Sequence, residues 1–525
     1  MITNLPEESR VSLDHIDEKA MAPLARDVLA LLNLSGVDMG RETHYNTKEE
    51  QEKARTELHR AVFERDRSIY GCMFCLPGTT DFSKQKAVTA LLSNRWDDKP
   101  ATLTIDHENK MIQHMLREMQ ANRMINLFVD FDEKQINNSR TRKVVLRSLI
   151  DSKSFDLWSV KYRSKIKRAL IHVWNKKTSG VIQSIVRKKK EDLTSKEWGI
   201  LNRAFPGSRT AADGETILEC VKFIFGACDN PKLPIHRAFH EAKQDLSKGK
   251  RLPMEVLEGI RGLYHKDVPR KKLFEIVKDN LTTKQKRLVQ KSAKKAGVKV
   301  DFDPMRYPMT DLYIYAFEMG WTKEIARALG IKAKKAASTL PFKFGHVGVL
   351  LDNSQSMRGS DEQKLRPMAT ALATKDLIAC TGDKHTIVTA TMDSVPEIGA
   401  MTRPRGPSDL AGPFLELLKA EPDSIFIISD GYENAPEGRL SEVLQLARHV
   451  GIQIPVYHIN PVSASESKLG IRVLDDSIPV MPINKPEAIG LTLFKAMLET
   501  DPRRGLESLV GMALPILEKQ KEVTA

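Results

Sequence analysis

The stretch Phe344-Gly-His-Val-Gly-Val-Leu-Leu-Asp352-Asn-Ser354-Gln-Ser356 decides the fold of the C-terminal third of the chain. Its mostly apolar first part predicts a buried β-strand, and the polar residues that follow lie on the loop where the strand ends. This loop carries one carboxylate and two hydroxyls. Such hard oxygen ligands suit Mg²⁺, which is usually held by one or two carboxylates and keeps several water ligands. The loop therefore predicts a divalent-cation site with an open coordination position.

Two later segments extend this predicted site. Ser424-Ile-Phe-Ile-Ile-Ser-Asp430-Gly is a second apolar run that ends in an acid, and a turn before a predicted helix carries Ser408. Ligands of open parallel sheets bind beyond the carboxyl ends of the strands, so the two acids converge if their strands are neighbours. A purely structural alternative stays open, because Asp and Ser are also common in helix caps and Asx turns. The predicted metal ligands are Asp352, Ser354, Ser356, Ser408 and Asp430.

The order Asp-x-Ser-x-Ser, a distant hydroxyl and a distant Asp before Gly resembles the metal-ion-dependent adhesion site of von Willebrand factor A domains. The resemblance covers residues 340 to 500, and Ser408 stands where that family usually has Thr. Around these motifs, apolar runs alternate with predicted helices, which predicts a doubly wound parallel sheet with right-handed crossovers. The expected strands are 385–391, 424–430 and 454–459, and the expected helices are 363–380, 409–419 and 440–450.

The same region contains no catalytic sequence motif. It has no Walker loop, no nucleophile elbow and no Ser-His-Asp order. A nuclease that used Asp352 and Asp430 would need more carboxylates around two metal ions than these loops supply. We therefore expect a protein that is not an enzyme.

Charge is distributed unevenly along the chain. The net charge is +14, and residues 151–300 contain 35 Lys and Arg against 16 Asp and Glu, a net of +19. Residues 1–150, 301–340 and 341–525 have net charges of −1, +1 and −5. Lysines and arginines that neutralise phosphates release counterions, so one basic block of this size predicts a polyanion-binding surface. A solvated helical face is the alternative.

Residues 20 to 340 are expected to be mostly helical, because apolar residues recur at three- and four-residue spacing. Amphipathic helix pairs leave an apolar face for the next pair to cover, which predicts an irregular HEAT-like array. We expect a helical domain over residues 1–340 and a sheet domain with a C-terminal helical extension over residues 341–525. In the second half of the array, the expected helices are 214–225, 234–246, 253–264, 270–280, 283–296, 311–319 and 322–329.

The basic block contains the segment Lys165-Ile-Lys-Arg-Ala-Leu-Ile-His-Val-Trp with its continuation to residue 186, and the segment Leu193-Thr-Ser-Lys-Glu-Trp-Gly-Ile-Leu-Asn-Arg-Ala-Phe-Pro206. These two segments resemble the TROVE module of Ro ribonucleoproteins, a family in which a von Willebrand factor A domain follows the helical module. The resemblance implies that the array closes into a ring, with RNA on its basic outer surface and single-stranded ends in its hole. The resemblance also implies that three positions correspond to the family's RNA-binding loop. Lys196 stands at the position of a Lys, Ile200 at that of an Arg and Arg203 at that of a His.

The expected function is therefore that of an RNA-binding protein that holds small noncoding, misfolded or single-stranded RNA, with a Mg²⁺ site for partner binding. The resemblance implies small noncoding RNAs and an exoribonuclease as partners. The alternative is a protein-interaction adaptor that docks an acidic protein or an ATPase. From the basic block and the family loop, the predicted RNA-binding residues are Arg163, Lys165, Lys167, Arg168, Lys188, Lys189, Lys190, Lys196, Arg203, His236 and Arg237.

The cellular setting is predicted from two further features. No apolar stretch approaches the roughly 20 residues that span a bilayer, and the N-terminus does not resemble a signal peptide, so a cytoplasmic protein is expected. Five cysteines fit a reducing compartment. Cys72 and Cys75 have the spacing of half a zinc site, but no second pair completes it, so buried thiols are expected.

Overall fold

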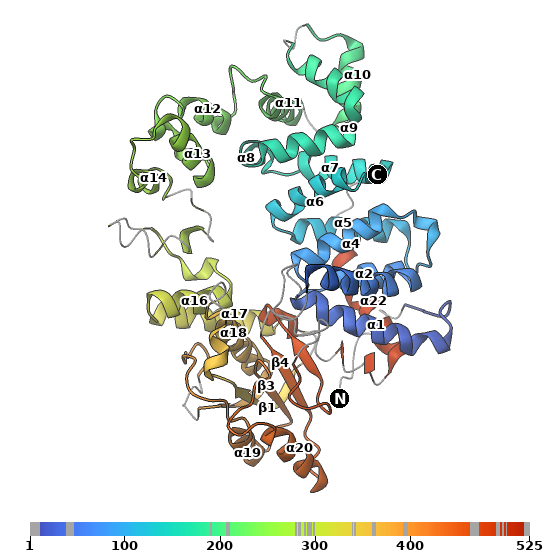
Figure 1. Cartoon of the computed structure of the whole chain (residues 1–525), viewed down its shortest axis with the longest axis vertical. Coiled ribbons are helices and arrows are strands. Elements are labelled where there is room, and N and C mark those ends of the chain that lie inside the picture. Colours follow the sequence, from blue (N-terminus) through green and yellow to red (C-terminus); the bar gives the residue numbers. More distant parts are fainter. Residues whose placement is uncertain are drawn as a thin grey trace. The chain divides into compact units, whose positions relative to one another are not determined.

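Contacts divide the chain into two compact units, which are described separately. The sheet unit comprises residues 1–87, 96–115 and 304–525, and the helical unit comprises residues 88–95 and 116–303. The computed structural model in Figure 1 describes residues 11–37, 47–188, 192–205, 211–278, 281, 285–287, 290, 297, 300–338, 340, 343–359, 364–391, 397–461, 472–489, 494–495, 498–499 and 501–518.

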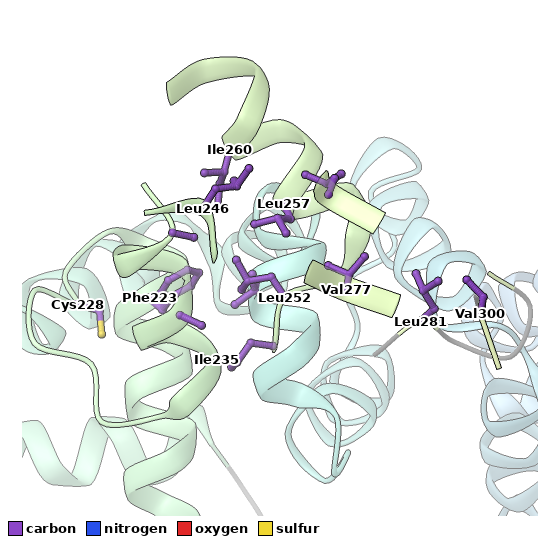
Figure 2. Packing of buried hydrophobic residues seen from close by; sticks show 14 residues of the cluster. Phe223, Cys228, Ile235, Leu246, Leu252, Leu257, Ile260, Val277, Leu281 and Val300 are labelled. Carbon is purple, nitrogen blue, oxygen red and sulfur yellow. The ribbon is translucent and has the colours of Figure 1, made fainter. Parts of the chain in front are cut away.

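The helical unit is a succession of short helices around an apolar core. The helix α6 packs against α9, and α8 packs against both α11 and α12. Figure 2 shows part of the core, in which Phe223, Ile235, Leu252 and Leu257 come from consecutive segments. The helices are α6 (Ala121–Glu133), α7 (Ser139–Ile150), α8 (Phe155–Lys161), α9 (Arg163–Val186), α10 (Ser195–Ala204), α11 (Ala211–Phe225), α12 (Pro234–Glu241), α13 (Met254–Tyr264) and α14 (Arg270–Val277).

Helix α9 is broken at the polar residue Asn175. Asn175 has φ 61° and ψ 163°, and its side chain accepts the backbone N–H of Thr178 at 3.0 Å. This hydrogen bond caps the second half of the helix, because the first N–H groups of a helix have no partner within it. The chain is thus helical on both sides of residue 175.

The sheet unit combines helices from both ends of the chain with the sheet. The C-terminal α22 packs against α1 and α3. The buried Arg67 forms two hydrogen bonds with Glu108, at 2.6 and 2.9 Å. These helices are α1 (Glu18–Val37), α2 (Lys48–Arg65), α3 (Arg67–Cys75), α4 (Asp81–Ser93), α5 (Ile105–Glu118), α16 (Met309–Met319), α17 (Lys323–Ala337) and α22 (Pro502–Glu518), of which α4 and α5 extend to residues of the helical unit.

The sheet has five parallel strands in the order β2-β1-β3-β4-β5. The connections from β1 to β2, from β2 to β3 and from β3 to β4 each run through a helix, as expected for a doubly wound sheet. The strands are β1 (Phe344–Leu351), β2 (Gly382–Thr389), β3 (Ser424–Ile428), β4 (Val456–Asn460) and β5 (Val480–Pro482), and the helices beside them are α18 (Arg366–Thr381), α19 (Ala411–Lys419) and α20 (Arg439–His449).

Helices cover both faces of this sheet. On one face, Leu350 of β1 and Ile425 and Ile427 of β3 form a core with residues of α19 and α20. Helix α18 packs against β1 and β2 and also against α16 and α17, and Figure 1 shows it on the side of the sheet opposite α19. Because it is covered on both sides, almost every residue of α18 is buried.

Two charged residues of α18 lie inside this packing. The Lys375 ammonium lies 2.9 Å from the Asp376 carboxylate, and both side chains have no exposed surface. Tyr313 of α16 donates its hydroxyl to Asp376 at 2.5 Å, and the backbone N–H of Gly399 donates to the same carboxylate at 3.0 Å. The carboxylate therefore ties α16 and the loop at residue 399 to the helix that covers the sheet.

The expected fold class is confirmed, since a mostly helical array precedes a doubly wound parallel sheet. The predicted strands shift by one to three residues, and β5 was not foreseen. Most of the predicted helix 283–296 lies outside the described residues. Closure of the array into a ring and the domain boundary at residue 340 stay predictions. Residue 340 lies between the end of α17 and the start of β1. None of the described helices is both long enough and apolar enough to cross a membrane.

Replacing Asp376 by Ala should strongly destabilise the sheet unit. The change leaves the buried Lys375 ammonium without its carboxylate, which typically costs about 3–5 kcal/mol. The measurement is the urea midpoint followed by circular dichroism. The matched control is Asp383→Ala in the exposed start of β2, which should change stability by about 0.5 kcal/mol or less. Equal midpoints for the two variants would show that the buried pair does not hold the unit together.

Candidate metal centre and nucleic-acid interface

Asp352 and Asp430 are brought together because β1 and β3 are neighbours in the sheet. Leu351 pairs with Ile428, and the backbone N–H of Asp352 donates to the carbonyl of Ile428 at 2.9 Å. Residues that follow these two strands therefore leave the sheet at the same edge. Asp352 has no exposed surface and Asp430 has only 5%.

The Asp352 carboxylate is the centre of a hydroxyl-rich cluster. One oxygen accepts the backbone N–H of Ser354 at 2.9 Å, as in an Asx turn. The other accepts the hydroxyls of Ser429 at 2.7 Å and Ser408 at 3.2 Å. Burial raises the pKa of Asp352, and the hydroxyl and backbone hydrogen bonds oppose this shift. The Asx turn that the sequence left open as a purely structural role for Asp352 is thus present. It does not account for the hydroxyls of Ser408 and Ser429, which come from other segments.

The remaining predicted ligands lie in the same cluster. The hydroxyls of Ser354 and Ser356 are 3.0 Å apart. Asp430 accepts the backbone N–H of Tyr432 at 3.1 Å. Burial and, after it, the charge of Asp352 raise the pKa of Asp430 to about 6, while a hydrogen bond from Ser356 lowers it. Two buried carboxylates that repel each other are stabilised by a cation between them.

Ser408 is positioned by a loop that the sequence motifs did not reveal. Its backbone N–H donates to the Asn434 side chain at 2.8 Å, and its carbonyl accepts the N–H groups of Asn434 and Ala435. The neighbouring Arg405 donates its backbone N–H to the carbonyl of Asn353. These bonds hold the 405–410 segment over the end of β1, so the distant hydroxyl reaches Asp352.

The backbone conformation of residue 431 and its close neighbour Arg472 require glycine after Asp430. Its φ is +85°, and a Cβ atom there would lie 2.9 Å from Cγ of Arg472. Arg472 in turn lies over the ring of Tyr432, 3.5 Å from the centroid, and its charge lowers the pKa of Asp430. A cation and an aromatic ring therefore border the carboxylate cluster.

The structure brings all five predicted metal ligands into one cluster. Ser429 was missed, although it directly precedes Asp430 and contacts Asp352 at 2.7 Å. Leu351 pairs with Ile428, so Ser429 follows β3 at the level where Asp352 follows β1, a register that the sequence motifs alone do not give. The donor set is one of carboxylate and hydroxyl oxygens, the chemistry that Mg²⁺ prefers. The residues therefore fit a divalent cation held by Asp352, Asp430 and the serine hydroxyls.

Binding of Mg²⁺ should weaken in acid. The pKa of Asp430 is about 6 in the folded protein without a cation, so its proton must leave before a cation binds. Affinity measured by calorimetry should fall by at least about tenfold per pH unit below this value, as expected for one proton released. Asp430→Asn, which cannot titrate, should bind weakly at every pH. An affinity of the unmodified protein that is flat between pH 5 and pH 7 would contradict the site.

The same shift predicts how stability responds to pH. The ordinary pKa of Asp is 3.8 and the folded value for Asp430 is about 6, so the folded state binds the proton more tightly than the unfolded state. The contribution of Asp430 is fully present below pH 3.8 and is lost as pH rises through about 6. Without a cation, the urea midpoint should therefore fall over this interval, after subtraction of the curve for Asp430→Asn. Saturating Mg²⁺ should remove the fall.

The predicted RNA-binding residues fall into three groups. Lys165, Arg168, Lys188, Lys196, Arg203 and Arg237 are exposed, and Arg163 and Lys167 are half-buried. His236 has no exposed surface and lies 2.7 Å from the Ser159 hydroxyl and 3.0 Å from the Glu219 carboxylate inside the helical unit, so it does not lie on a surface that RNA would contact. Lys189 and Lys190, like Pro206, lie outside the described residues.

The segment expected as a loop at residues 196–206 begins with a helix. Thr194 and Glu197 form a capping box, in which each side chain accepts the other residue's backbone N–H, and this starts α10 at Ser195. Lys196, Ile200 and Arg203 are four and three residues apart and so share a face of α10. Lys196 and Arg203 are exposed, and neither forms an ion pair within the part of the chain that the structure describes.

Several other basic residues have local partners. Arg168 bonds to Asp132 and Glu133, at 2.6 and 3.2 Å, and Lys188 bonds to Glu197 at 2.7 Å. Arg163 lies over the ring of Phe223 and donates to a backbone carbonyl of α11. These surface pairs leave the net charge unchanged but reduce the number of cations that are free to contact a phosphate.

Trp174 is not available for base stacking. It is buried, its indole N–H donates to the carbonyl of Ala204 at 3.2 Å, and its ring packs against Phe205 and Phe225. Trp158, Tyr162 and Trp198 are half-buried and keep partial access to solvent. Trp174 instead joins the basic helix α9 to α10 and α11, so it positions the exposed cations.

The fold and site define a helical-repeat protein with a doubly wound parallel-sheet domain that carries an oxygen-ligand cluster at its strand ends. The chain matches no protein-family model and no curated protein sequence. Among solved structures, it is similar to the crystal structure of the Deinococcus radiodurans Ro (RSR) protein. The similarity has a TM-score of 0.39 and 13% sequence identity, and it covers 90% of this chain and 100% of that chain.

Proposed function

We propose that the protein is an RNA-binding protein of Ro type without enzymatic activity. The observation that carries the proposal is the basic block of residues 151–300, which has a net charge of +19 and whose described residues include exposed cations of the helical unit such as Lys165 and Lys196. Lys196 and Arg203 present two cations on one face of α10, and Lys176 and Lys177 are exposed at the break in α9. A surface of this kind attracts the phosphate chain of RNA with little dependence on base sequence.

The proposed ligand is small noncoding RNA or the single-stranded end of a misfolded RNA. Single strands can place bases on aromatic rings and on guanidinium planes, which paired RNA cannot do. Arg203 and the half-buried Trp198 are both on α10, so one helix offers a cation and a ring. This supports a single-stranded segment near α10 rather than a continuous duplex.

We further propose that the carboxylate cluster holds Mg²⁺ and recruits a protein partner. Mg²⁺ keeps open positions for water when a site supplies few carboxylates, and a partner's acidic side chain can replace one water. Arg472 borders the cluster and would favour an acidic group there. An exoribonuclease is the partner that the sequence resemblance implies, and an adaptor that docks an acidic protein is the alternative outcome.

Reversing three charges on the helical unit should weaken RNA binding. The variant Lys188→Glu, Lys196→Glu and Arg203→Glu changes exposed residues near α10. If each contacts a phosphate, the slope of log affinity against log salt should fall by about 2, at roughly 0.7 per contact with a single strand. The measurement is a gel shift with single-stranded RNA at several salt concentrations.

The control for this variant makes the same change in net charge elsewhere. Lys323, Arg327 and Lys334 are exposed on α17 of the sheet unit, and reversing them to Glu also lowers the net charge by six. This control should leave the salt slope unchanged. Equal slopes for both variants and the unmodified protein would remove the α10 surface from the proposal, and failure of the unmodified protein to retain RNA would favour the adaptor.

The two proposed activities should be separable. Asp352→Ala removes the central carboxylate and should abolish Mg²⁺ binding in calorimetry, while RNA affinity stays within about twofold because no exposed cation of the helical unit is changed. Ser429→Ala, which removes one hydroxyl from Asp352, should weaken Mg²⁺ binding without abolishing it. Full Mg²⁺ uptake by Asp352→Ala would exclude this cluster as the metal centre.

A further inference from the structure

A second group of ligand-type side chains lies inside the helical unit, away from the carboxylate cluster. Glu219 of α11, Cys228 of the following loop and His236 of α12 each direct one ligand atom to a common point, and these atoms lie within 4.8 Å of one another. The side chains of Glu219 and His236 are 13% and 0% exposed. Figure 2 shows Cys228 at the edge of the apolar core, beside Phe223.

The proton positions around His236 leave one nitrogen without a proton. The Ser159 hydroxyl lies 2.6 Å from the carbonyl of Asp156, and a carbonyl can only accept, so the single hydroxyl proton points there. His236 Nε2 lies 2.7 Å from the same hydroxyl oxygen and must therefore be the donor in that contact. A neutral ring with its proton on Nε2 has a bare lone pair on Nδ1.

That lone pair faces a carboxylate. Nδ1 of His236 lies 3.0 Å from Oε1 of Glu219, and neither atom can donate when the ring is neutral. Glu219 also accepts the backbone N–H groups of Leu233 and Lys232, at 2.7 and 2.9 Å, so its oxygens act as acceptors throughout. A proton on Nδ1 or a metal ion between the two atoms would satisfy both acceptors, and the nearby thiol of Cys228 favours the metal ion.

We propose that Glu219, Cys228 and His236 bind a zinc ion. Zinc is held by imidazole nitrogen, thiolate sulfur and carboxylate oxygen. Structural zinc sites usually have four protein ligands, and here the three side chains would leave the fourth position to water. The thiol argues against Mg²⁺ and Ca²⁺, which prefer oxygen ligands only. His236 would bind through Nδ1, and its Nε2–H would donate to Ser159, the arrangement that usually orients a metal-bound histidine.

The position of the cluster gives the ion a structural role. Glu219 lies in α11, Cys228 in the loop and His236 in the first turn of α12, and the ring of His236 stacks on Phe223, with 4.2 Å between centroids. One ion would therefore join two consecutive helices of the array and the loop between them. Burial raises the pKa of the Cys228 thiol to about 11, so without a cation it is not a reactive thiolate.

Cobalt substitution tests this site in the full-length protein. Asp352→Ala serves as the parent, so that the carboxylate cluster of the sheet does not take up the ion. After chelation, one equivalent of Co²⁺ should produce a thiolate-to-cobalt charge-transfer band, and Zn²⁺ should abolish it by competition. Cys228→Ser should lose the band, whereas Cys380→Ser, which removes a half-buried thiol of α18, should keep it.

Ser159→Ala tests the role of the hydrogen bond to Nε2. It touches no proposed ligand atom, and loss of such an outer partner typically weakens metal affinity by about 10–100-fold. Absence of the band in the parent, or its survival in Cys228→Ser, would overturn the proposal and leave Glu219 as a cap of α12. If Cys228→Ser does not fold, alkylation of the parent decides: Zn²⁺ should slow modification of Cys228 but not of Cys380, and equal rates would overturn the proposal.

Discussion

The side-by-side pairing of β1 and β3 is the constraint on which the rest of the sheet site depends. Because the two strands are parallel and in register from Val347 to Leu351, their ends coincide, and the residues after them meet. Had β2 stood between them, Asp352 and Asp430 would be separated by the width of a strand, about 4.8 Å more. The hydroxyl of Ser429 then bonds to Asp352 as a direct consequence of register. The loops at residues 405–410 and 431–435 need only close over an edge that the sheet has already assembled.

Helix α18 makes this sheet part of a larger body. An ordinary covering helix of such a sheet has one apolar face and one polar face, but α18 is buried on both. Its outer face packs on α16 and α17, and there Lys375 and Asp376 are satisfied by each other and by groups from other segments. A buried ion pair stabilises little by itself, yet removing one partner is costly, so it fixes which surfaces meet. The helices α16 and α17 are therefore packed in the same compact unit as the sheet.

Much of this organisation could be predicted from sequence because periodicity and strand-end motifs are local. The run from Phe344 to Ser356 contains both the strand and three of the ligands, and Asp430 ends a run of the same kind. What could not be predicted depended on tertiary contacts. The capping box at Thr194 turned an expected loop into α10, and neighbours from α8 and α11 buried His236, which its place in the basic block had led us to predict as an RNA-binding residue. Arg163 was likewise predicted as a phosphate contact, but it packs on Phe223.

The helical unit uses its polar residues in two physically different ways. On the surface, ion pairs such as Arg168 with Asp132 contribute little stability and are screened by salt. Asp132 lies outside residues 151–300, so this pair offsets a small part of the block's positive charge. Most of the excess of +19 stays to attract a polyanion at long range, while close contacts are left to cations such as Lys196 and Arg203. In the interior, polar contacts matter much more for stability, because a buried polar group without a hydrogen-bond partner is costly. At His236 the bond from Ser159 to the carbonyl of Asp156 leaves Nδ1 facing the Glu219 carboxylate, and this arrangement is the basis of the proposed metal ion.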